Sequence, residues 1–429
     1  MSRRQPSRRK PLRIAYLVYR GNPHCGGQGV YTRALAKELT ELGHEITVFS
    51  GPPYPDLVHP EQLEAVPGLD LYRANNPFRV PWPHEFRDRI DLSEFAIMCA
   101  AGYPEPLAFS LRIRRLLQHR RGEFDLVHDN QCLGRGLVPM IEEDGWPVLA
   151  TLHHPITVDR DLDVAHAPNA FRRFSIRRWY SFLDMQMEVA RRMPRVLTVS
   201  ESSRGDIVEQ MGVSADRLHI VPVGMDPEIF GPRPAIARVP GRLMTTASAD
   251  VPMKGLAPLL ESLAKVRAER NDAHLVVIGK PKGKSKIPAL IERLGLTDAV
   301  EFVSGVTTER IVELYAQAEV ACVPSLYEGF SLPAVEAMAC GVPVVGTTGG
   351  AVPEVIGRDG ETGLLVPPGD PDAFAVALLR ALGDPELRAR IGAAGRERAI
   401  ARVTWRRTAE GTAEHYHAML DEHPKAGGR

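Results

Sequence analysis

The chain has 429 residues, of which 44% are hydrophobic and 25% charged, and its formal net charge is +0. This length suggests two domains of roughly 200 residues each, and the balanced charge gives no indication of a nucleic-acid partner. The 5 cysteines never form a CxxC spacing, which argues against a disulfide framework and against a zinc site.

The N-terminus is basic, and no apolar segment that resembles a secretory signal follows it. No apolar run reaches the roughly 18 residues that a membrane span needs. We therefore expect a disordered basic tail over residues 1–12 and a cytoplasmic protein. A weak electrostatic contact of this tail with the inner face of a membrane is the alternative.

The first half of the chain alternates short buried-strand patterns with helical patterns. Residues 29–44 carry apolar positions at helical spacing and end at Gly43, where a helix terminates. The predicted strands are residues 13–19, 45–50, 124–128, 147–153, 195–200 and 217–223. This alternation predicts βαβ units and a parallel sheet.

A second series of the same kind follows residues 221–241, which are rich in proline and glycine and lack periodicity. We interpret that stretch as the connection between two domains. The second series of predicted strands is residues 241–248, 274–279, 299–305, 319–325 and 341–347. The chain is thus predicted to form two doubly wound α/β domains, with the cleft between them as the active site.

The segment SLYEGFSLPAVEAMACGVPVV places two glutamates around a predicted helix start. Pro333 suits the first turn of a helix that ends at Gly341, and a helix N-terminus binds anions such as phosphate. Glu336, expected in the first turn, and Glu328, before the helix, could then accept hydrogen bonds from the hydroxyls of a nucleotide sugar. The simpler interpretation is that one glutamate complements the helix dipole and the other is solvated.

The stretch EGFSLPAVEAMACGVPVVGTTGGAVPEVI resembles the donor-site motif of retaining glycosyltransferases of the GT-B fold, family GT4. Other segments are similar to this family in the same order, and the similarity is weakest from about residue 52 to 122. These segments are residues 26–50, 198–207, 221–230 and 362–378.

The resemblance implies two Rossmann-like domains that face a cleft. It implies an acceptor-binding domain over 13–224, a donor-binding domain over 225–404 and a helix over 405–429 that crosses back to the first domain. It also implies a retaining, metal-independent transferase that uses a nucleoside-diphosphate sugar, with a UDP-sugar as the first choice, and no cofactor. The acceptor and the oligomeric state are left open.

The resemblance also implies roles for particular residues of the donor-binding domain. Glu328 would contact the donor sugar, Glu336 would bind the ribose, and Lys254 would offset the negative charge that grows on the leaving diphosphate. The other residues implied at the donor site are Gly329, Phe330, Ser331, Leu332, Gly279, Lys280 and Val306.

In the N-terminal domain, the family places a histidine near the sugar at a strand end. The segment LATLHHPIT offers His153, which the Thr-x-His alignment favours, and His154, for which a structural role or a place in the acceptor loop is the ordinary expectation. Gly26, Gly27 and Gly29 would let the first loop approach the diphosphate and the acceptor. Glu328, His153 and Lys254 are therefore the predicted catalytic residues.

The chain departs from the family at one point. Relatives carry an arginine shortly before the lysine of the phosphate clamp, and this chain has Ser248 and Ala249 there. Lys280, Lys282 or Lys284 could substitute for it, and the alternative is that these lysines form a solvated basic loop.

Three other features leave alternatives open. The sequence DRDLD at 159–163 contains an Asp-x-Asp pattern, but we expect no metal site there. Residues 171–192 are basic and aromatic, and they predict either a core-facing helix or docking on an anionic membrane or acceptor. A nucleotide-sugar epimerase, a phosphorylase and a non-catalytic nucleotide-sugar-binding module are the rival functions.

Overall fold

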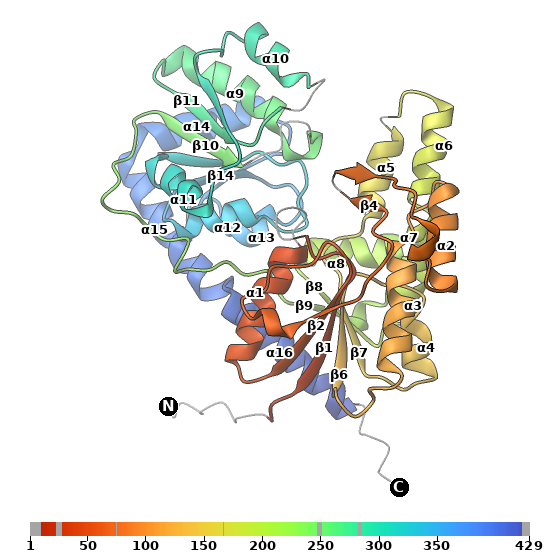
Figure 1. The fold of residues 1–429 in the computed structure, drawn as a ribbon. Helices are drawn as coiled ribbons and strands as arrows, with labels where there is room; N and C mark the ends of the chain where they lie inside the picture. The colour runs from red at the N-terminus through yellow and green to blue at the C-terminus, as the bar shows by residue number, and fades with distance from the viewer. Residues whose placement is uncertain are drawn as a thin grey trace, which may run out of the picture. The chain divides into compact units, whose positions relative to one another are not determined.

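The computed structural model describes residues 10–22, 28–73, 75–165, 167–246, 251–281 and 285–422. They form two compact units, each built around its own parallel sheet (Figure 1). The first unit comprises Met1–Thr198, Arg204–Val221 and Thr408–Arg429, and the second comprises Val199–Ser203 and Pro222–Arg407. The prediction of two doubly wound α/β folds is confirmed.

The sheet of the first unit has seven strands, and every neighbouring pair is parallel. Its order in space is β3 (Leu63–Ala65), β2 (Glu45–Ser50), β1 (Arg13–Val18), β6 (Leu126–Asn130), β7 (Val148–Thr151), β8 (Arg195–Thr198) and β9 (Leu218–Ile220). The order reverses between β1 and β6, and ligands bind beyond the carboxyl ends of strands at such a switch point.

Helices cover both faces of this sheet (Figure 1). One core joins β1, β6 and β7 to α3, α4 and α7 through residues such as Leu17, Val127 and Ala150. The described helices that lie wholly or partly in this unit are α1 (Gln28–Glu41), α2 (Arg89–Cys99), α3 (Glu105–Leu117), α4 (Leu137–Glu142), α5 (Thr157–Ala165), α6 (Ala170–Trp179), α7 (Phe182–Ala190), α8 (Glu201–Asp206) and α16 (Trp405–Glu422). A short antiparallel pair, β4 (Tyr72–Arg73) and β5 (Asn76–Pro77), stands apart from the sheet.

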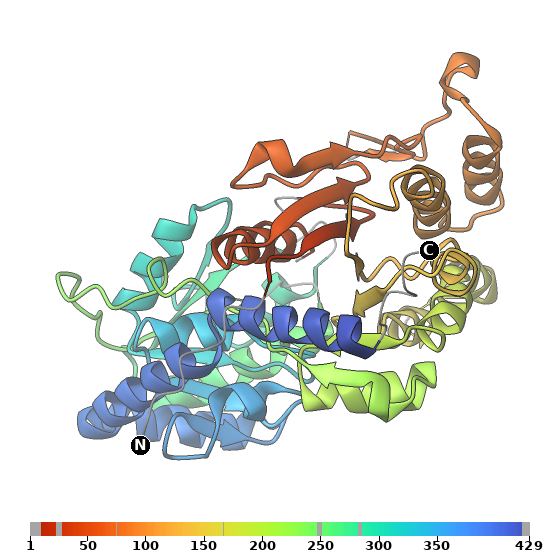
Figure 2. The same cartoon turned by 90° about the horizontal axis from the view of Figure 1, so that it is seen from below.

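The last helix belongs to the first unit for most of its length. Tyr416 of α16 is fully buried, and its hydroxyl lies 2.5 Å from Nδ1 of His128 on β6. The other ring nitrogen of His128 lies 2.7 Å from the hydroxyl of Thr151 on β7. In Figure 2, α16 is the dark blue helix beside these strands. The hydrogen bonds tie the C-terminal end of the chain to the centre of the N-terminal sheet.

The second unit has a six-stranded parallel sheet, and its order reverses between β10 and β13. Alternate residues of each strand face different cores: Leu243 joins the core under α9 and α14, and Met244 joins the core under α11 and α12. The order in space is β12 (Val300–Val303), β11 (His274–Ile278), β10 (Arg242–Thr246), β13 (Val320–Val323), β14 (Val344–Thr347) and β15 (Leu364–Val366). The helices are α9 (Leu256–Glu269), α10 (Ile287–Arg293), α11 (Thr308–Gln317), α12 (Leu332–Ala339), α13 (Val352–Ile356), α14 (Pro371–Gly383) and α15 (Pro385–Arg402).

All eleven predicted strands are present in the described residues, within a few residues of their predicted bounds. The edge strands β3 and β15, of three residues each, were not predicted. The linker over 221–241 contains no helix or sheet strand, as predicted, and only Met225 forms a bridge, to Thr404. No helix in the described ranges is long and apolar enough to cross a bilayer.

Candidate functional site

The switch point of the second sheet brings Lys254 and Glu328 together. Lys254 lies in the loop after β10, and Glu328 lies in the loop after β13. The Lys254 Nζ atom is 3.0 Å from both carboxylate oxygens of Glu328. A backbone hydrogen bond of 2.8 Å from the N–H of Leu326 to the carbonyl of Met253 joins the two loops. Two predicted catalytic residues therefore form one partly buried ion pair.

The side chain of Glu328 is buried, and its carboxylate is fixed by hydrogen bonds. Only 7% of its side chain is exposed, whereas 35% of the Lys254 side chain is exposed. The hydroxyl of Ser325 donates to Oε1 of Glu328 over 2.7 Å. Because a lysine ammonium has three donor protons, Lys254 can contact Glu328 and still offer its solvent-facing side to an anion.

Glycines allow the close packing of these loops. Gly255, which follows Lys254, has φ +68°, and a Cβ there would lie 1.9 Å from the carbonyl oxygen of Pro324. In the Gly-Gly loop of the motif, a Cβ on Gly350 would lie 2.4 Å from the carbonyl oxygen of Glu328. The N–H of Ala351 also donates to that carbonyl, over 2.8 Å. Only glycine fits both positions, so the loop that carries Glu328 is tightly enclosed.

The helix after Glu328 is α12, which begins at Leu332 and has Pro333 within its first two positions. Ser331 precedes it, and the buried Ser331 hydroxyl has no hydrogen-bond partner among the described residues. The first N–H groups of a helix have no partner within the helix. The carbonyl of Gly329 accepts hydrogen bonds from Ser200 (2.7 Å) and Ser203 (3.1 Å), which belong to the same unit. The N-terminus of α12 thus combines the Ser331 hydroxyl and the first N–H groups of the helix with a positive dipole end.

The described helix has no acidic residue in its first turn, so Glu336 lies further along α12 than we predicted. The prediction was wrong because the helix starts at Leu332, before the proline. The Tyr315 hydroxyl donates to Oε2 of Glu336 over 3.4 Å. Burial raises the pKa of Glu336 to about 7, against the opposing effect of the Tyr315 hydrogen bond. The helix ends as predicted, with Gly341 at φ +71° after the C-cap residue Cys340.

The remaining predicted donor-site residues lie at the same edge of the second sheet. Gly279 follows β11 with φ +148°, and its N–H donates to the carbonyl of Val303 over 2.8 Å. Lys280 is exposed, and Val306 is half-buried beyond the end of β12. Phe330 is half-buried between Glu328 and α12. Four residues named in the predictions lie outside the described residues: Ser248, Ala249, Lys282 and Lys284.

In the first unit, His153 lies just beyond β7, next to the switch point. Its Nε2 atom is 2.8 Å from Oδ1 of Asn130, and its ring meets the Tyr31 ring edge-on with centroids 4.6 Å apart. Burial, assisted by the charge of His154, lowers the pKa of His153 to about 3, so the ring is neutral. Gly29 is the second residue of α1, and a Cβ there would lie 2.1 Å from the backbone carbonyl oxygen of Asn22. Gly26 and Gly27 lie outside the described residues.

Sequence reasoning missed the polar residues at the end of β6. Asp129 and Asn130 are both fully buried. The Oδ2 atom of Asp129 accepts the N–H of Leu133 over 2.9 Å, and Oδ1 has no partner in the described part of the chain. Burial raises the pKa of Asp129 to about 7. The signal was available, because HDNQ is a polar run at the end of a buried strand.

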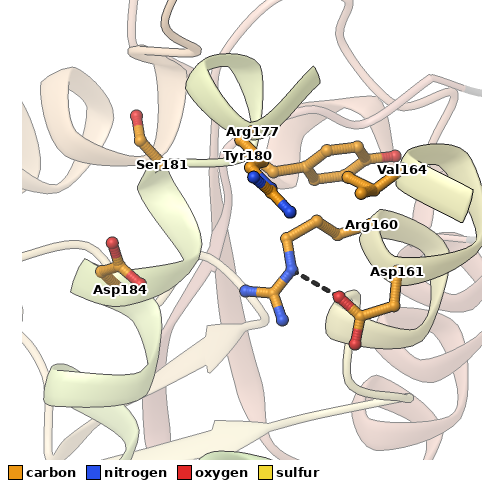
Figure 3. Close-up of a pocket in the computed structure, with 7 residues that line it drawn as sticks. All are labelled: Arg160, Asp161, Val164, Arg177, Tyr180, Ser181 and Asp184. Atoms are coloured by element: carbon orange, nitrogen blue, oxygen red, sulfur yellow. Dashed lines mark hydrogen bonds and ion pairs between the residues drawn. The ribbon is translucent and has the colours of Figure 1, made fainter. Parts of the chain in front are cut away.

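A polar pocket of about 380 Å³ lies between α5, α6 and α7, a few residues along the chain from His153. Figure 3 shows Arg160, Arg177 and Tyr180 converging on it, with Asp184 further away on α7. The Arg160 Nε atom donates to Oδ1 of Asp161 over 2.8 Å. Two arginines and two aspartates are among the residues that line the pocket, so their charges balance. The lining residues are Arg160, Asp161, Val164, Arg177, Tyr180, Ser181 and Asp184.

The three aspartates of DRDLD contact three different partners. Asp159 pairs with His154 at 3.1 Å, Asp161 pairs with Arg160, and Asp163 accepts the Tyr180 hydroxyl over 2.9 Å. No group of three His, Cys, Asp or Glu side chains suited to a metal ion occurs in the described ranges. The pattern therefore has a local structural explanation.

The basic aromatic stretch only partly fits the prediction of a core-facing helix. Phe171 and Phe174 of α6 are 81% and 68% exposed, and α6 has no buried residue. The core prediction is wrong for these two residues, because nothing in the described part of the unit covers them. Trp179 does pack, against Tyr72 and Tyr103 at centroid distances of 5.3 and 5.1 Å.

Comparisons with known proteins agree with this arrangement. The family model for Glycosyl transferases group 1 matches residues 238–398, and the model for Glycosyltransferase Family 4 matches residues 25–229. The chain is 50% identical over 410 residues to the MMP alpha-(1->4)-mannosyltransferase of Mycolicibacterium hassiacum, which covers 95% of this chain and 98% of that protein.

Two solved structures show the likeness of the fold. Sucrose-phosphate synthase from Thermosynechococcus elongatus matches with a TM-score of 0.71 and 24% identity, over 96% of this chain and 100% of that one. HepE from Anabaena, solved in complex with UDP and glucose, matches with a TM-score of 0.69 and 18% identity, over 95% and 100%.

Proposed function

The chain belongs to the family of group 1 and family 4 glycosyltransferases and has the predicted GT-B fold, and we propose that it transfers a sugar with retention from a nucleoside-diphosphate sugar. The observation that carries this proposal is the Lys254–Glu328 pair at the switch point, followed by the N-terminus of α12. A cation, a helix N-terminus and the Ser331 hydroxyl, which has no partner in the described ranges, together suit a diphosphate.

The chemistry assigned to these groups is electrostatic. Cleavage of the sugar–phosphate bond places negative charge on the leaving diphosphate, and the Lys254 ammonium with the N–H groups of α12 stabilises it. In metal-dependent transferases a metal ion supplies this positive charge. Because Lys254 and the N-terminus of α12 supply it here, we expect activity to persist in EDTA. The leaving phosphate takes the proton of the acceptor hydroxyl, so no carboxylate is needed as a base.

Glu328 acts as a hydrogen-bond acceptor for the donor sugar. Its carboxylate is oriented by Ser325 and Lys254, and its burial excludes water from the side away from the ligand. We propose that Glu336 accepts hydrogen bonds from the ribose hydroxyls of the donor. Uridine remains our prediction for the base, and mannose is the proposed sugar because the 50% identical relative is a mannosyltransferase.

We assign acceptor contacts to the pocket between α5, α6 and α7. Its volume of about 380 Å³ lies in the range of about 300–1,000 Å³ that is typical of small-ligand sites. The lining offers donors and acceptors side by side without a net charge, which suits the hydroxyls of a neutral saccharide better than a phosphate. The named activity of the relative, an alpha-(1->4)-mannosyltransferase, also favours a saccharide acceptor.

A weak contact with anionic lipid is proposed for α6. Phe171 and Phe174 are exposed beside Arg172 and Arg173, a combination that favours the interface of an anionic bilayer. Sedimentation with anionic and with neutral liposomes tests this contact. Pelleting that does not depend on anionic lipid would rule it out.

The donor proposal is tested by thermal unfolding with UDP, GDP, ADP and dTDP. A nucleotide at about 100 times its Kd adds about 2.7 kcal/mol of stability, which is several degrees of midpoint. We expect one nucleotide to raise the midpoint of the wild-type protein and of Glu313→Ala, an exposed control on α11, but not of Glu336→Ala. No shift with any nucleotide would refute the donor assignment.

Turnover then separates the rival functions. With the matching nucleotide sugar, a transferase releases the nucleoside diphosphate in proportion to added mannooligosaccharide. An epimerase would convert the nucleotide sugar without an acceptor, and a phosphorylase would require inorganic phosphate. A binding module would show the thermal shift without any turnover.

A further inference from the structure

We propose that Asn130 is a positioning residue that holds His153 as the tautomer with its proton on Nε2, so that Nδ1 is the ring's free acceptor. The catalytic consequence of the inference rests on the proposed function, in which His153 takes part in the transfer. Its structural part stands on three hydrogen bonds that connect α1, β6 and the loop after β7.

The first hydrogen bond sets the direction of the other two. The Thr32 hydroxyl on α1 lies 2.8 Å from the backbone carbonyl of Gln28. A carbonyl oxygen can only accept, so the single hydroxyl proton of Thr32 is donated there. Toward any other neighbour, the Thr32 oxygen acts as an acceptor.

The side-chain amide of Asn130 forms the next two hydrogen bonds of the series. Its Nδ2 atom is 3.3 Å from the Thr32 oxygen, and its Oδ1 atom is 2.8 Å from Nε2 of His153. Because Thr32 must accept, the NH₂ end of the amide faces Thr32 and the carbonyl end faces the histidine. A carbonyl oxygen next to Nε2 requires the proton to be on Nε2. Thr32 and Asn130 are fully buried, so water does not compete for these bonds.

A second clamp fixes the backbone that carries the ring. The Gln131 side chain accepts the N–H of His153 and donates to the carbonyl of His154, each over 2.9 Å. Gln131 itself has φ +54°, which costs free energy for a residue with a side chain. The buried amide of Gln186 on α7 donates to the carbonyls of Gln131 and Cys132 over 3.4 and 3.0 Å. The end of β6 therefore fixes both the position of His153 and its proton.

The surroundings of His153 favour the neutral ring. Among the described residues, the titratable groups that act on it are Tyr31 on α1, His128 on β6 and the adjacent His154, none of which is an anion at neutral pH. Asn130 supplies the hydrogen bond without a charge, whereas an aspartate there would stabilise an imidazolium. The ring is thus a directed hydrogen-bond partner in the reaction and not a source of positive charge.

The test is the ¹⁵N spectrum of the histidine rings in the full chain without ligand, so it does not depend on turnover. The chain has 14 histidines, and His153→Gln identifies the pair of signals that belongs to His153. We expect one protonated nitrogen, Nε2, and one unprotonated nitrogen, Nδ1, unchanged from pH 5 to 8. A proton on Nδ1, or a ring that titrates in this range, would overturn the inference.

Two substitutions of Thr32 test whether the hydrogen bonds set the tautomer of His153. Thr32→Ser keeps the hydroxyl, and Thr32→Val removes it with nearly the same shape. We expect the serine variant to retain the wild-type pattern and the valine variant to average the two ¹⁵N shifts, because the amide can then rotate. Wild-type shifts in Thr32→Val would show that the chain of hydrogen bonds does not set the tautomer.

Asn130→Asp adds an independent readout. We expect the His153 signals to titrate between pH 5 and 8 in this variant and kcat to acquire a matching pH dependence that the wild type lacks. Titration without any effect on kcat would leave the tautomer assignment intact and remove the role of His153 in transfer. Absence of titration would contradict the proposed Asn130–His153 contact.

Discussion

The substitution Lys254→Ala tests whether the pair at the donor switch point serves both stability and catalysis. In the wild type 7% of the Glu328 side chain is exposed, and truncation of Lys254 leaves the carboxylate with Ser325 as its remaining partner among the described residues. Breaking a fully buried pair costs about 3–5 kcal/mol, and losing an exposed pair costs about 0–1 kcal/mol. With 35% of the lysine exposed, we expect a loss of about 2 kcal/mol in the free energy of unfolding.

For a unit of this size, about 2 kcal/mol corresponds to a decrease of about 4–8 °C in the midpoint of thermal unfolding. Adding Glu328→Gln removes the stranded charge, so the double variant should regain most of that decrease. The control is Lys265→Ala, because Lys265 pairs with Asp372 where both side chains are well exposed. We expect a change of at most about 0.5 kcal/mol in the control.

Activity should behave differently from stability. Loss of one electrostatic stabiliser lowers kcat by about 10²–10³, and Lys254→Ala should show this decrease in the release of nucleoside diphosphate. The double variant should remain at least as impaired in kcat as Lys254→Ala although its stability recovers. A double variant less stable than Lys254→Ala, or full activity in Lys254→Ala, would refute the reasoning.

Two further predictions use the same unit. Gly255→Ala should lower the free energy of unfolding by more than about 2 kcal/mol, because its φ is +68° and its Cβ would lie 1.9 Å from the Pro324 oxygen. The control Gly295→Ala, at φ +67° with open space around it, should lower it by about 1 kcal/mol. Equal denaturation midpoints for the two variants would contradict this prediction. Burial raises the pKa of Glu336 from 4.5 to about 7. Between these two pH values the folded state keeps the proton of Glu336 and the unfolded chain releases it. The free energy of unfolding therefore falls as the pH rises from 4.5 through 7. Glu336→Gln should therefore raise the unfolding midpoint relative to the wild type at pH 8 more than at pH 5, and a pH-independent difference would argue against a buried carboxylate.

Much of the fold could be predicted from local pattern. The strands of both sheets are short apolar runs between helical periods, and the helix over 332–339 ends where Gly341 adopts a left-handed conformation. The glycines after Lys254 and in the Gly-Gly loop stand where only glycine fits. These features depend on a few neighbouring residues, which is the range over which a sequence pattern is informative.

Periodicity does not tell which element covers an apolar side chain. The pattern of residues 171–192 is compatible with a packed helix, and only the arrangement of the unit leaves Phe171 and Phe174 exposed. The start of α12 at Leu332, which moved Glu336 out of the first turn, was likewise beyond the local signal, because proline is tolerated at more than one early position.

The sequence by itself determined the two α/β units, their strands and the donor-site motif. Only the tertiary structure decided the partners: Glu328 meets a lysine 74 positions earlier, His153 meets an asparagine 23 positions earlier, and Tyr416 reaches His128 across 288 positions. The physical reason is the parallel sheet, which brings strand ends to one edge whatever their separation along the chain. Which side chains meet there depends on strand order and register, and neither is encoded in a local pattern.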